Sequence, residues 1–391
     1  MKVCTICDDL FPSYWTSTNQ VVTSASSLGK VGVDVDLMIP ILVSNLFKSR
    51  EKRLRELCEF YGVEPTFNLK DIFTVMPTNK FRIEKFTHGM LAPLLARLGD
   101  YDLIYTRHVL PVILSIYSGG KAMFETYRLL PEEFPQTIPL IRKIAHHPNF
   151  LGITTHSELS SNAFIEAGVP EEKVISLHNG FDPEEFEPKL SKGEARKLLG
   201  LPEEGFYATY TGHMTSFKGT EMFIDIAKYA PGVQFLLIGG PTEKEVEHMK
   251  ALAQKNNLDN VKIMGWLKPH LIPPYLYASD VLMIPPTDKP LKLHGRTVLP
   301  IKIFNYLAAG RVIFAPDLED TEEILHHGVN SFKVQPNNPQ KAAAALNNIA
   351  ADPLMANNIA EKALQDSKKY TWSQRALNLK KFMEKRLKAS G

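Results

Sequence analysis

The chain has 391 residues, of which 44% are apolar and 23% are charged, ordinary values for a globular protein. This composition excludes a disordered or fibrous chain, and the length predicts two domains that each bury a core of their own. The 45 basic and 43 acidic residues leave a formal charge of +2, which argues against a dedicated nucleic-acid-binding protein.

The beginning of the chain lacks the pattern of a secretory signal, because Asp8 and Asp9 interrupt its apolar residues early. No apolar run approaches the ~18 residues that a membrane-spanning helix needs. Three cysteines are too few for a disulfide framework and favour a reducing compartment. Cys4 and Cys7 form a C-x-x-C pair without the second pair of a zinc site, so we expect them in the core. A cytoplasmic protein is the resulting expectation.

Short β-rich runs alternate with helix-length amphipathic stretches along almost the whole chain, which is typical of parallel βαβ units. Six strands are predicted in the first half, at 3–7, 35–39, 102–106, 122–125, 152–154 and 174–177. The pattern then restarts with five more, at 207–211, 233–238, 261–264, 281–284 and 312–315. We therefore expect an α/β fold of two Rossmann-like, doubly wound parallel sheets.

The two predicted domains are 1–188 and 189–371, since proline and charge replace the apolar pattern near 186–192. The basic amphipathic stretch 372–388 predicts a further helix, which periodicity alone assigns to neither domain. Ligands of open α/β sheets bind beyond the carboxyl ends of the strands. We therefore expect the chemistry in a cleft where the two sheets face each other.

Another basic amphipathic stretch covers 46–61, beginning at Leu46 and ending at Tyr61. A helix of this kind can lie on an anionic membrane surface, which would suit a lipid-linked substrate. An ordinary helix with a solvated basic face is the more common explanation. Peripheral membrane contact through this stretch is therefore the less common of the two explanations.

His108 directly follows the strand predicted at 102–106. At a strand end its imidazole could face a ligand and titrate, since perturbed titratable groups gather in such places. A structural histidine with satisfied hydrogen bonds is the alternative explanation.

The strongest local motif runs from Leu299 through Pro300 to Gly310 and is followed by the strand at 312–315. Proline suits the first turn of a helix, and glycine suits its end. The unpaired N–H groups at such a helix start could hold a diphosphate near 297–301. The alternative is a plain connection between a helix and a strand.

A loop at 212–219 links the strand 207–211 to a predicted helix. Gly212 lets the backbone approach a ligand closely, and the ammonium of Lys218 could neutralise a phosphate charge. The loop has neither the dinucleotide glycine spacing nor a Walker pattern, so an ordinary loop with a solvated lysine competes with this reading. Residues 178–186 contain Asn-Gly and Asp-Pro, and we interpret them as a tight turn between the domains.

Taken in order, these motifs resemble those of the retaining glycosyltransferases of family four, which have the GT-B fold. The resemblance is carried by 153–157, 178–182, 212–219, 299–310 and the sequence Tyr-Thr-Trp-Ser at 370–373. Each motif is modest alone, but five in the right order are specific. The resemblance implies a nucleotide donor held mainly by the second domain and an acceptor held mainly by the first. It also implies a final helix, within 372–391, that crosses back to complete the first domain.

The resemblance further assigns roles to single residues. Lys218 contacts the donor diphosphate, Trp266 lies where the family reads the base, and Asn305 lies where the family binds the ribose. No metal or other cofactor is expected, because a helix start and basic side chains neutralise the charge. The implied donor-binding residues are Gly212, Trp266, Thr297, Val298, Leu299 and Asn305.

The chain departs from the family pattern in the donor half. His213 stands where an arginine is common, and a neutral imidazole is a weaker partner for phosphate. Thr297 and Asn305 stand where the family has two glutamates eight residues apart. Asparagine still hydrogen-bonds a hydroxyl but supplies no charge.

Departures also occur in the acceptor half. Thr16 and Ser17 replace the usual glycine pair after the first strand. Tyr127 stands where the family has a histidine after an acidic residue, which is Glu125 here.

The sequence therefore predicts a retaining transferase that moves a hexose from a nucleotide-diphosphate sugar, with UDP as the favoured nucleotide, to a sugar, small-molecule or lipid-linked hydroxyl. A nucleotide-sugar-binding protein without turnover is the alternative, and a Rossmann oxidoreductase is disfavoured by the missing glycine spacing. The residues expected to act in catalysis are Lys218, His213, Tyr127 and Glu125, and those expected on the acceptor side are Thr16, Ser17 and His108.

Overall fold

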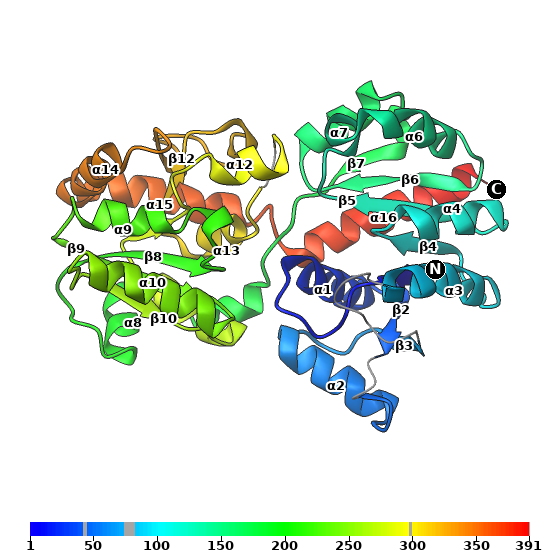
Figure 1. Cartoon of the computed structure of the whole chain (residues 1–391), viewed down its shortest axis with the longest axis horizontal. Helices are drawn as coiled ribbons and strands as arrows, with labels where there is room; N and C mark the ends of the chain where they lie inside the picture. Colours follow the sequence, from blue (N-terminus) through cyan, green and yellow to red (C-terminus); the bar gives the residue numbers. More distant parts are fainter. Residues whose placement is uncertain (42–44, 74–82, 297–298, 391) are drawn as a thin grey trace. The chain divides into compact units, whose positions relative to one another are not determined.

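The computed structural model describes residues 1–41, 45–73, 83–296 and 299–390 (Figure 1). The chain divides into two compact units. The N-terminal unit is Met1–Asn179 together with Trp372–Gly391, and the C-terminal unit is Gly180–Thr371. Among the described residues, no helix has the length and apolarity that crossing a bilayer requires.

The N-terminal unit is built on a seven-stranded sheet in the order β3-β2-β1-β4-β5-β6-β7. All neighbouring strands are parallel. The strands are β1 (Lys2–Ile6), β2 (Asp34–Ile41), β3 (Asn68–Phe73), β4 (Leu103–Thr106), β5 (Ala122–Thr126), β6 (Phe150–Thr155) and β7 (Val174–Ser176).

Helices cover both faces of this sheet. They are α1 (Thr16–Lys30), α2 (Arg50–Tyr61), α3 (Ile83–Arg97), α4 (Val109–Tyr117), α5 (Leu130–Glu133), α6 (Ile138–Ala145), α7 (Glu158–Glu166) and α16 (Trp372–Ala389). One core joins β1 to α1, α2 and α16, with Leu379 of α16 fully buried. The other core lies against α3, α4 and α7 and includes Val112 and Phe164. In Figure 1, α16 at the red end of the chain lies beside the blue α1, which it contacts.

The C-terminal unit has a six-stranded parallel sheet in the order β10-β9-β8-β11-β12-β13. The strands are β8 (Phe206–Gly212), β9 (Val233–Gly239), β10 (Val261–Met264), β11 (Val281–Met283), β12 (Val312–Pro316) and β13 (Phe332–Val334). The helices are α8 (Lys192–Leu198), α9 (Glu221–Ala227), α10 (Glu243–Lys255), α11 (Pro273–Ala278), α12 (Lys289–His294), α13 (Lys302–Ala309), α14 (Pro339–Ala351) and α15 (Pro353–Ser367).

Two cores again lie on opposite faces of the sheet. One packs α9, α10 and α14 against it and includes Phe223, Met249 and Leu346. The other packs α8, α11, α13 and α15 and includes Leu276 and Leu307. Short 3-10 turns lie at Pro135–Thr137, Glu171–Lys173, Pro183–Phe186, Ser216–Lys218, Pro269–Leu271 and Glu319–Thr321.

The prediction of two doubly wound parallel sheets is confirmed. Burial of Cys4 and Cys7 without a disulfide confirms their place in the core. Two strands, β3 and β13, were missed, and both lie at sheet edges. An edge strand is half exposed and tolerates polar residues such as Asp71, and a three-residue strand such as β13 is too short to show a period.

The chain passes from the first unit to the second between Asn179 and Gly180, earlier than the proline-rich and charged stretch suggested. The reason is packing, because Phe181 and Phe186 belong to the core of the C-terminal unit together with Tyr277. The Asp-Pro turn forms there, since the Asp182 carboxylate accepts the N–H of Glu184 at 3.1 Å.

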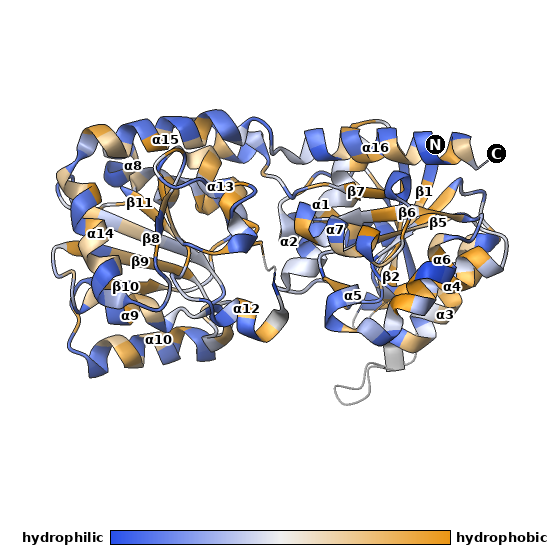
Figure 2. Cartoon of the chain, turned by 90° about the horizontal axis from the view of Figure 1, so that it is seen from above, coloured by the Kyte–Doolittle hydropathy of each residue, from blue (hydrophilic) through white to orange (hydrophobic). Residues whose placement is uncertain are grey.

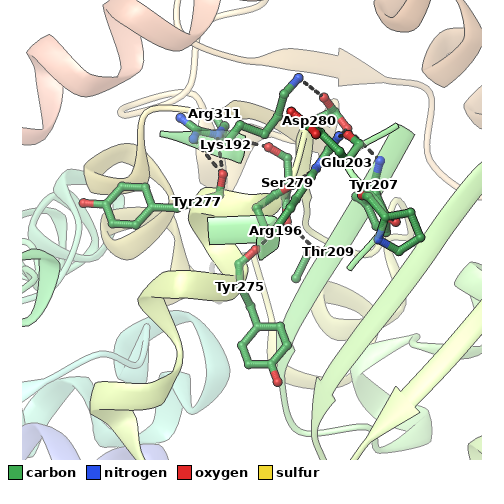
Figure 3. Close-up of polar contacts among 12 residues, drawn as sticks. Lys192, Arg196, Glu203, Tyr207, Thr209, Tyr275, Tyr277, Ser279, Asp280 and Arg311 are labelled. Carbon is green, nitrogen blue, oxygen red and sulfur yellow. Dashed lines mark hydrogen bonds and ion pairs between the residues drawn. The ribbon is translucent and has the colours of Figure 1, made fainter. Parts of the chain in front are cut away.

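A polar network fixes the amino-terminal edge of the second sheet (Figure 3). The Asp280 carboxylate, just before β11, accepts hydrogen bonds from Arg196 at 2.7 Å and from Lys192 at 2.6 Å. It also accepts the backbone N–H of Tyr207 at 2.7 Å, at the start of β8. The guanidinium of Arg311 reaches the carbonyls of the loop after α11 from the other side, including that of Ser279 at 3.0 Å. The network therefore ties α8, β8, β11 and β12 together.

Removing the carboxylate of Asp280 should strongly destabilise the C-terminal unit. Asp280→Ala leaves the Arg196 guanidinium, which is 4% exposed, without its charge partner, at a cost of about 3–5 kcal/mol. Urea unfolding measures this loss. The matched control is Asp225→Ala, which breaks an exposed pair with Lys228 and should change the free energy of unfolding by about 1 kcal/mol or less. Equal effects of the two substitutions would contradict the role given to the network.

Candidate functional site

Glycines bring the carboxyl ends of β8 and β9 into close contact. Gly212 and Gly239 have φ values of 134° and 129°, which L side chains rarely adopt. A Cβ on Gly239 would lie only 2.1 Å from the carbonyl oxygen of Gly212. The N–H of Gly240 donates to that same oxygen at 3.1 Å. The ends of β8 and β9 therefore pack backbone against backbone, which only glycine allows at Gly239.

Two lysines converge on the end of β8. Lys218 ends the 3-10 turn after β8, and Lys302 is the first residue of α13. The ammonium of Lys302 lies 3.6 Å from the centre of the Tyr210 ring. A Cβ on Gly212 would lie 3.0 Å from this ammonium, which shows how close the lysine comes to the end of β8.

The two ammonium groups are poorly neutralised. Burial lowers the pKa of Lys218. Burial, and then the positive charge of Lys218, hold the pKa of Lys302 well below its usual value. Within the described ranges, no carboxylate forms an ion pair with either lysine. Two lysines that lie close together without a carboxylate partner form a positively charged region, and an anion would complement it and favour the charged form of both side chains.

The hydroxyl of Tyr306 holds the start of α13 at this edge. It accepts the N–H of Thr211 at 2.9 Å and approaches the Met283 carbonyl at 3.4 Å, which joins α13 to β8 and β11. Gly310 ends the helix in the left-handed conformation, with φ 60°. The proline–glycine motif thus forms a helix whose first turn lies beside Gly212.

The other residues predicted to bind the donor lie partly inside and partly outside the described ranges. Thr297 and Val298 lie outside the described residues. Leu299 is half-buried against the core that contains α13, and Asn305 lies half-buried on α13 itself. Trp266 follows β10 and is 38% exposed, so its indole does not simply fill a core.

His213 has an acidic neighbour. Its Nδ1 lies 3.4 Å from a carboxylate oxygen of Glu245, on α10. The other oxygen of Glu245 accepts the N–H of Met214 at 2.7 Å, and the Tyr210 hydroxyl donates to the His213 carbonyl at 2.6 Å. These bonds fix the loop that carries Lys218. His213 was expected to assist with a phosphate, but its imidazole faces a negative charge.

In the N-terminal unit, Glu125 is the centre of a buried ion network. Its Oε1 lies 2.5 Å from a guanidinium nitrogen of Arg375 and 2.9 Å from Nε2 of His156. Its Oε2 lies 3.2 Å from Nε of Arg107. Burial alone would raise the pKa of Glu125, but Arg107 and Arg375 hold that pKa well below its usual value. Burial also lowers the pKa of His156 to about 4.

This network indicates a structural role for Glu125. The carboxylate is 4% exposed and both oxygens are engaged, so it does not reach the surface where a sugar would lie. Its structural role is to tie α16, through Arg375, to the carboxyl edge of the sheet. Arg375 and His156 were not predicted as site residues; His156 follows β6, where polar side chains of a parallel sheet gather, whereas Arg375 has no local signal.

Four predicted residues do lie near this edge of the N-terminal sheet. Tyr127 is 52% exposed, and its ring centre lies 6.4 Å from that of His156. Thr16 and Ser17 begin α1, and the Ser17 carbonyl accepts a hydrogen bond from Arg107 at 3.1 Å. Tyr127, Thr16 and Ser17 are therefore available to a ligand.

His108, the fourth, belongs to a polar cluster at the end of β1. Its Nε2 lies 2.8 Å from the Asp8 carboxylate, and Lys85 contacts Asp8 and Asp9 at 3.3 and 2.8 Å. Ligand atoms of Cys7, Asp9 and His108 lie within 4.8 Å of one another. Burial raises the pKa of the Cys7 thiol, and Lys85 already neutralises the aspartates, so the cluster does not favour a metal.

Comparison with known proteins finds a family that matches part of the C-terminal unit. Residues 205–352, which include both strands of the glycine contact, Lys218 and Lys302, match the family described as glycosyl transferases group 1. Over these residues the chain is similar to the group 1 glycosyltransferases.

The relatives of this chain are distant. A D-inositol 3-phosphate glycosyltransferase from Corynebacterium urealyticum is 23% identical over 308 residues, 74% of this chain and 68% of that protein. An uncharacterised glycosyltransferase from Methanocaldococcus jannaschii is 24% identical over 230 residues, and the match covers little more than half of its length, 56%.

Solved structures share the GT-B fold with this chain. The Anabaena protein HepE, in complex with UDP and glucose, superimposes with a TM-score of 0.73 at 19% identity, covering 98% of this chain and 100% of HepE. Sucrose-phosphate synthase from Thermosynechococcus elongatus gives a TM-score of 0.78 at 16% identity, with both chains covered completely.

Stability of the N-terminal unit should fall as the pH is lowered from about 6.5 to 4. Burial lowers the folded-state pKa of both His156 and His88 to about 4, from 6.5. The unfolded chain therefore takes up protons first, and stability that is complete above pH 6.5 is lost on the way to pH 4. Thermal unfolding midpoints measured across this range test the slope.

The control is His88→Leu. Neither ring nitrogen of His88 has a hydrogen-bond partner among the described residues, so this change removes the titration without breaking a bond. It should make the dependence on pH shallower. An unchanged slope would contradict the assignment to His88.

Proposed function

We propose that this chain transfers a hexose from UDP-hexose to a hydroxyl of a sugar, small-molecule or lipid-linked acceptor, with retention at the anomeric carbon. The observation that carries the proposal is the pair of desolvated ammonium groups, Lys218 and Lys302, beside Gly212. A diphosphate would supply the negative charge that complements these two lysines. Support for the nucleotide comes from HepE, whose structure holds UDP and glucose.

The pocket suits a reaction in which the leaving diphosphate accumulates negative charge. Lys218 and Lys302 would stabilise that charge in a partly desolvated site, where electrostatic interactions are strong. The acceptor hydroxyl attacks the anomeric carbon from the face that the diphosphate leaves, and the diphosphate takes the hydroxyl proton. Such a mechanism needs no carboxylate base, which is consistent with the engagement of Glu125 elsewhere.

The remaining roles are those that the resemblance to the family implies. Trp266 would contact the base, and Asn305 would hydrogen-bond the ribose. On the N-terminal unit, Tyr127, Thr16 and Ser17 would line the acceptor side. Glu125 would act as a positioning residue, because it holds His156 beneath Tyr127 and anchors α16.

A nucleotide-sugar-binding protein without turnover is the second candidate. The contact between His213 and Glu245 favours it, because a negative charge beside the expected phosphate partner weakens that contribution. Incubation with UDP-glucose separates the two functions. Saturable binding without hydrolysis or transfer, across a panel of sugar and lipid-linked acceptors, would support the binding protein.

Substituting either lysine should weaken both binding and chemistry. Lys218→Ala and Lys302→Ala should each lower UDP-glucose turnover by at least about tenfold, since each removes a charge partner of the developing anion. Calorimetry should show that the affinity for UDP falls by about tenfold or more. The affinity for uridine, which lacks the diphosphate, should change little.

The matched control is Lys289→Ala. Lys289 is also close to this loop, but its ammonium already contacts Ser216 at 3.0 Å and Glu221 at 3.7 Å. We expect its removal to leave UDP affinity within about twofold. Full UDP affinity in both the Lys218 and Lys302 variants would overturn the proposed donor pocket.

A further inference from the structure

Helix α3 packs with its small residues inward and its large apolar residues outward. Gly89, Ala92 and Ala96 face the protein, and both alanines are fully buried in the core of the N-terminal unit. The outward face carries long apolar side chains at helical spacing, the reverse of an ordinary surface helix. The large apolar residues that α3 exposes are Phe86, Met90, Leu91, Leu94, Leu95 and Leu98.

This outer face is extensive. Phe86 is 67% exposed, Leu94 is 52% exposed and Leu98 is 85% exposed. Residues 86, 90, 94 and 98 form one row along the helix, and 91 and 95 form the adjacent row, so the six side chains make a continuous strip. Scattered exposed leucines need no explanation, but a contiguous apolar strip marks a surface that meets an apolar partner.

Basic and amphipathic groups border the strip at its carboxyl end. The Arg97 guanidinium donates to the Ser118 carbonyl at 3.1 Å, which places the end of α3 beside the end of α4. The neighbouring Tyr117 is 54% exposed, and its ring lies 4.9 Å from that of His147 and 5.9 Å from the ammonium of Lys143. Figure 2 shows α3, α4 and α6, all rich in orange, on the same side of the unit.

We propose that the outer face of α3 docks this protein onto an anionic lipid bilayer. Leucine, methionine and phenylalanine on one face of a helix, with lysine and arginine at its border, are the features of an interfacial helix that lies in the plane of a membrane. Arg97 and Lys143 match anionic headgroups, and Tyr117 has the apolar ring and polar tip that favour the headgroup level. Protein-binding hot spots favour tryptophan, tyrosine and arginine, whereas leucine is under-represented in them.

The basic stretch 46–61 offers a smaller apolar surface. Leu46 is 40% exposed and Phe47 is 99% exposed before α2 begins, but in α2 the apolar residues Leu57, Cys58 and Tyr61 are buried in the core of the unit. The helix itself therefore presents mainly its charged side to solvent. Membrane contact through this stretch stays a prediction, and α3 exposes the larger apolar strip.

Co-sedimentation with lipid vesicles tests the proposal. The wild-type chain should bind vesicles of phosphatidylglycerol and phosphatidylcholine, bind pure phosphatidylcholine more weakly, and lose affinity for the anionic vesicles as salt is added. Leu94→Glu combined with Leu98→Glu should lower the partition coefficient by at least about tenfold, since it places two charges in the strip. The control is Leu354→Glu on α15, a leucine that is 72% exposed in the other unit, and it should bind as the wild type does.

The proposal would be overturned if the wild-type chain did not bind vesicles, or if the double variant bound them as strongly as the wild type. It would also be overturned if the wild-type chain formed a dimer, the double substitution abolished that dimer, and neither protein bound vesicles. The last result would make the strip an interface between copies of this chain. Thermal unfolding verifies that the double variant is folded. UDP binding measured on the same variant should be unchanged, so failure of membrane docking is distinguishable from failure of the donor pocket.

Discussion

The close approach of Lys218 and Lys302, which lowers the pKa of Lys302 beyond the effect of burial, is the constraint on which the carboxyl edge of the second sheet is built. Lys218 and Lys302 come from separate elements, and folding alone gives no reason to bring them together. The surrounding residues hold this unfavourable arrangement in place. The hydroxyls of Tyr210 and Tyr306 fix the loop and the helix, and Glu245 fixes the backbone at Met214. Local strain maintained by rigid neighbours is a common property of sites prepared for a ligand.

The buried charges of the N-terminal unit are arranged differently from those of the C-terminal unit. Its buried charges are matched, since one carboxylate, Glu125, is surrounded by two guanidinium groups and a neutral imidazole. This arrangement makes the edge rigid and leaves Tyr127 and the start of α1 to face outward. The two sheets share one topology, but the lysines at one edge have no carboxylate partner within the described ranges, whereas the carboxylate Glu125 at the other edge is paired. The fold alone would not have distinguished them.

The elements whose signals lie within a short stretch of sequence could be predicted. The central strands are apolar runs, and both the proline–glycine helix and the lysine loop have signals within a dozen residues. Contacts between distant segments could not be predicted. Arg375 meets a carboxylate 250 positions earlier, and no local pattern records that meeting. Lys302 was missed because a lysine in a helical pattern normally points to water. Helix α3 was missed as a surface because its apolar composition is typical of a buried helix, and periodicity does not show which side faces the core.

The route of the chain between its two units has a consequence for how this architecture can vary. Both chain ends belong to the N-terminal unit, so the C-terminal unit is in effect an insertion within it. The ends of that insertion adjoin, because the N–H of Phe181 donates to the carbonyl of Tyr370 at 3.1 Å. A module whose entry and exit lie side by side can be exchanged as a cassette or expressed alone without leaving a broken sheet. Recombination at this single seam would let the two units evolve as separate inheritable parts.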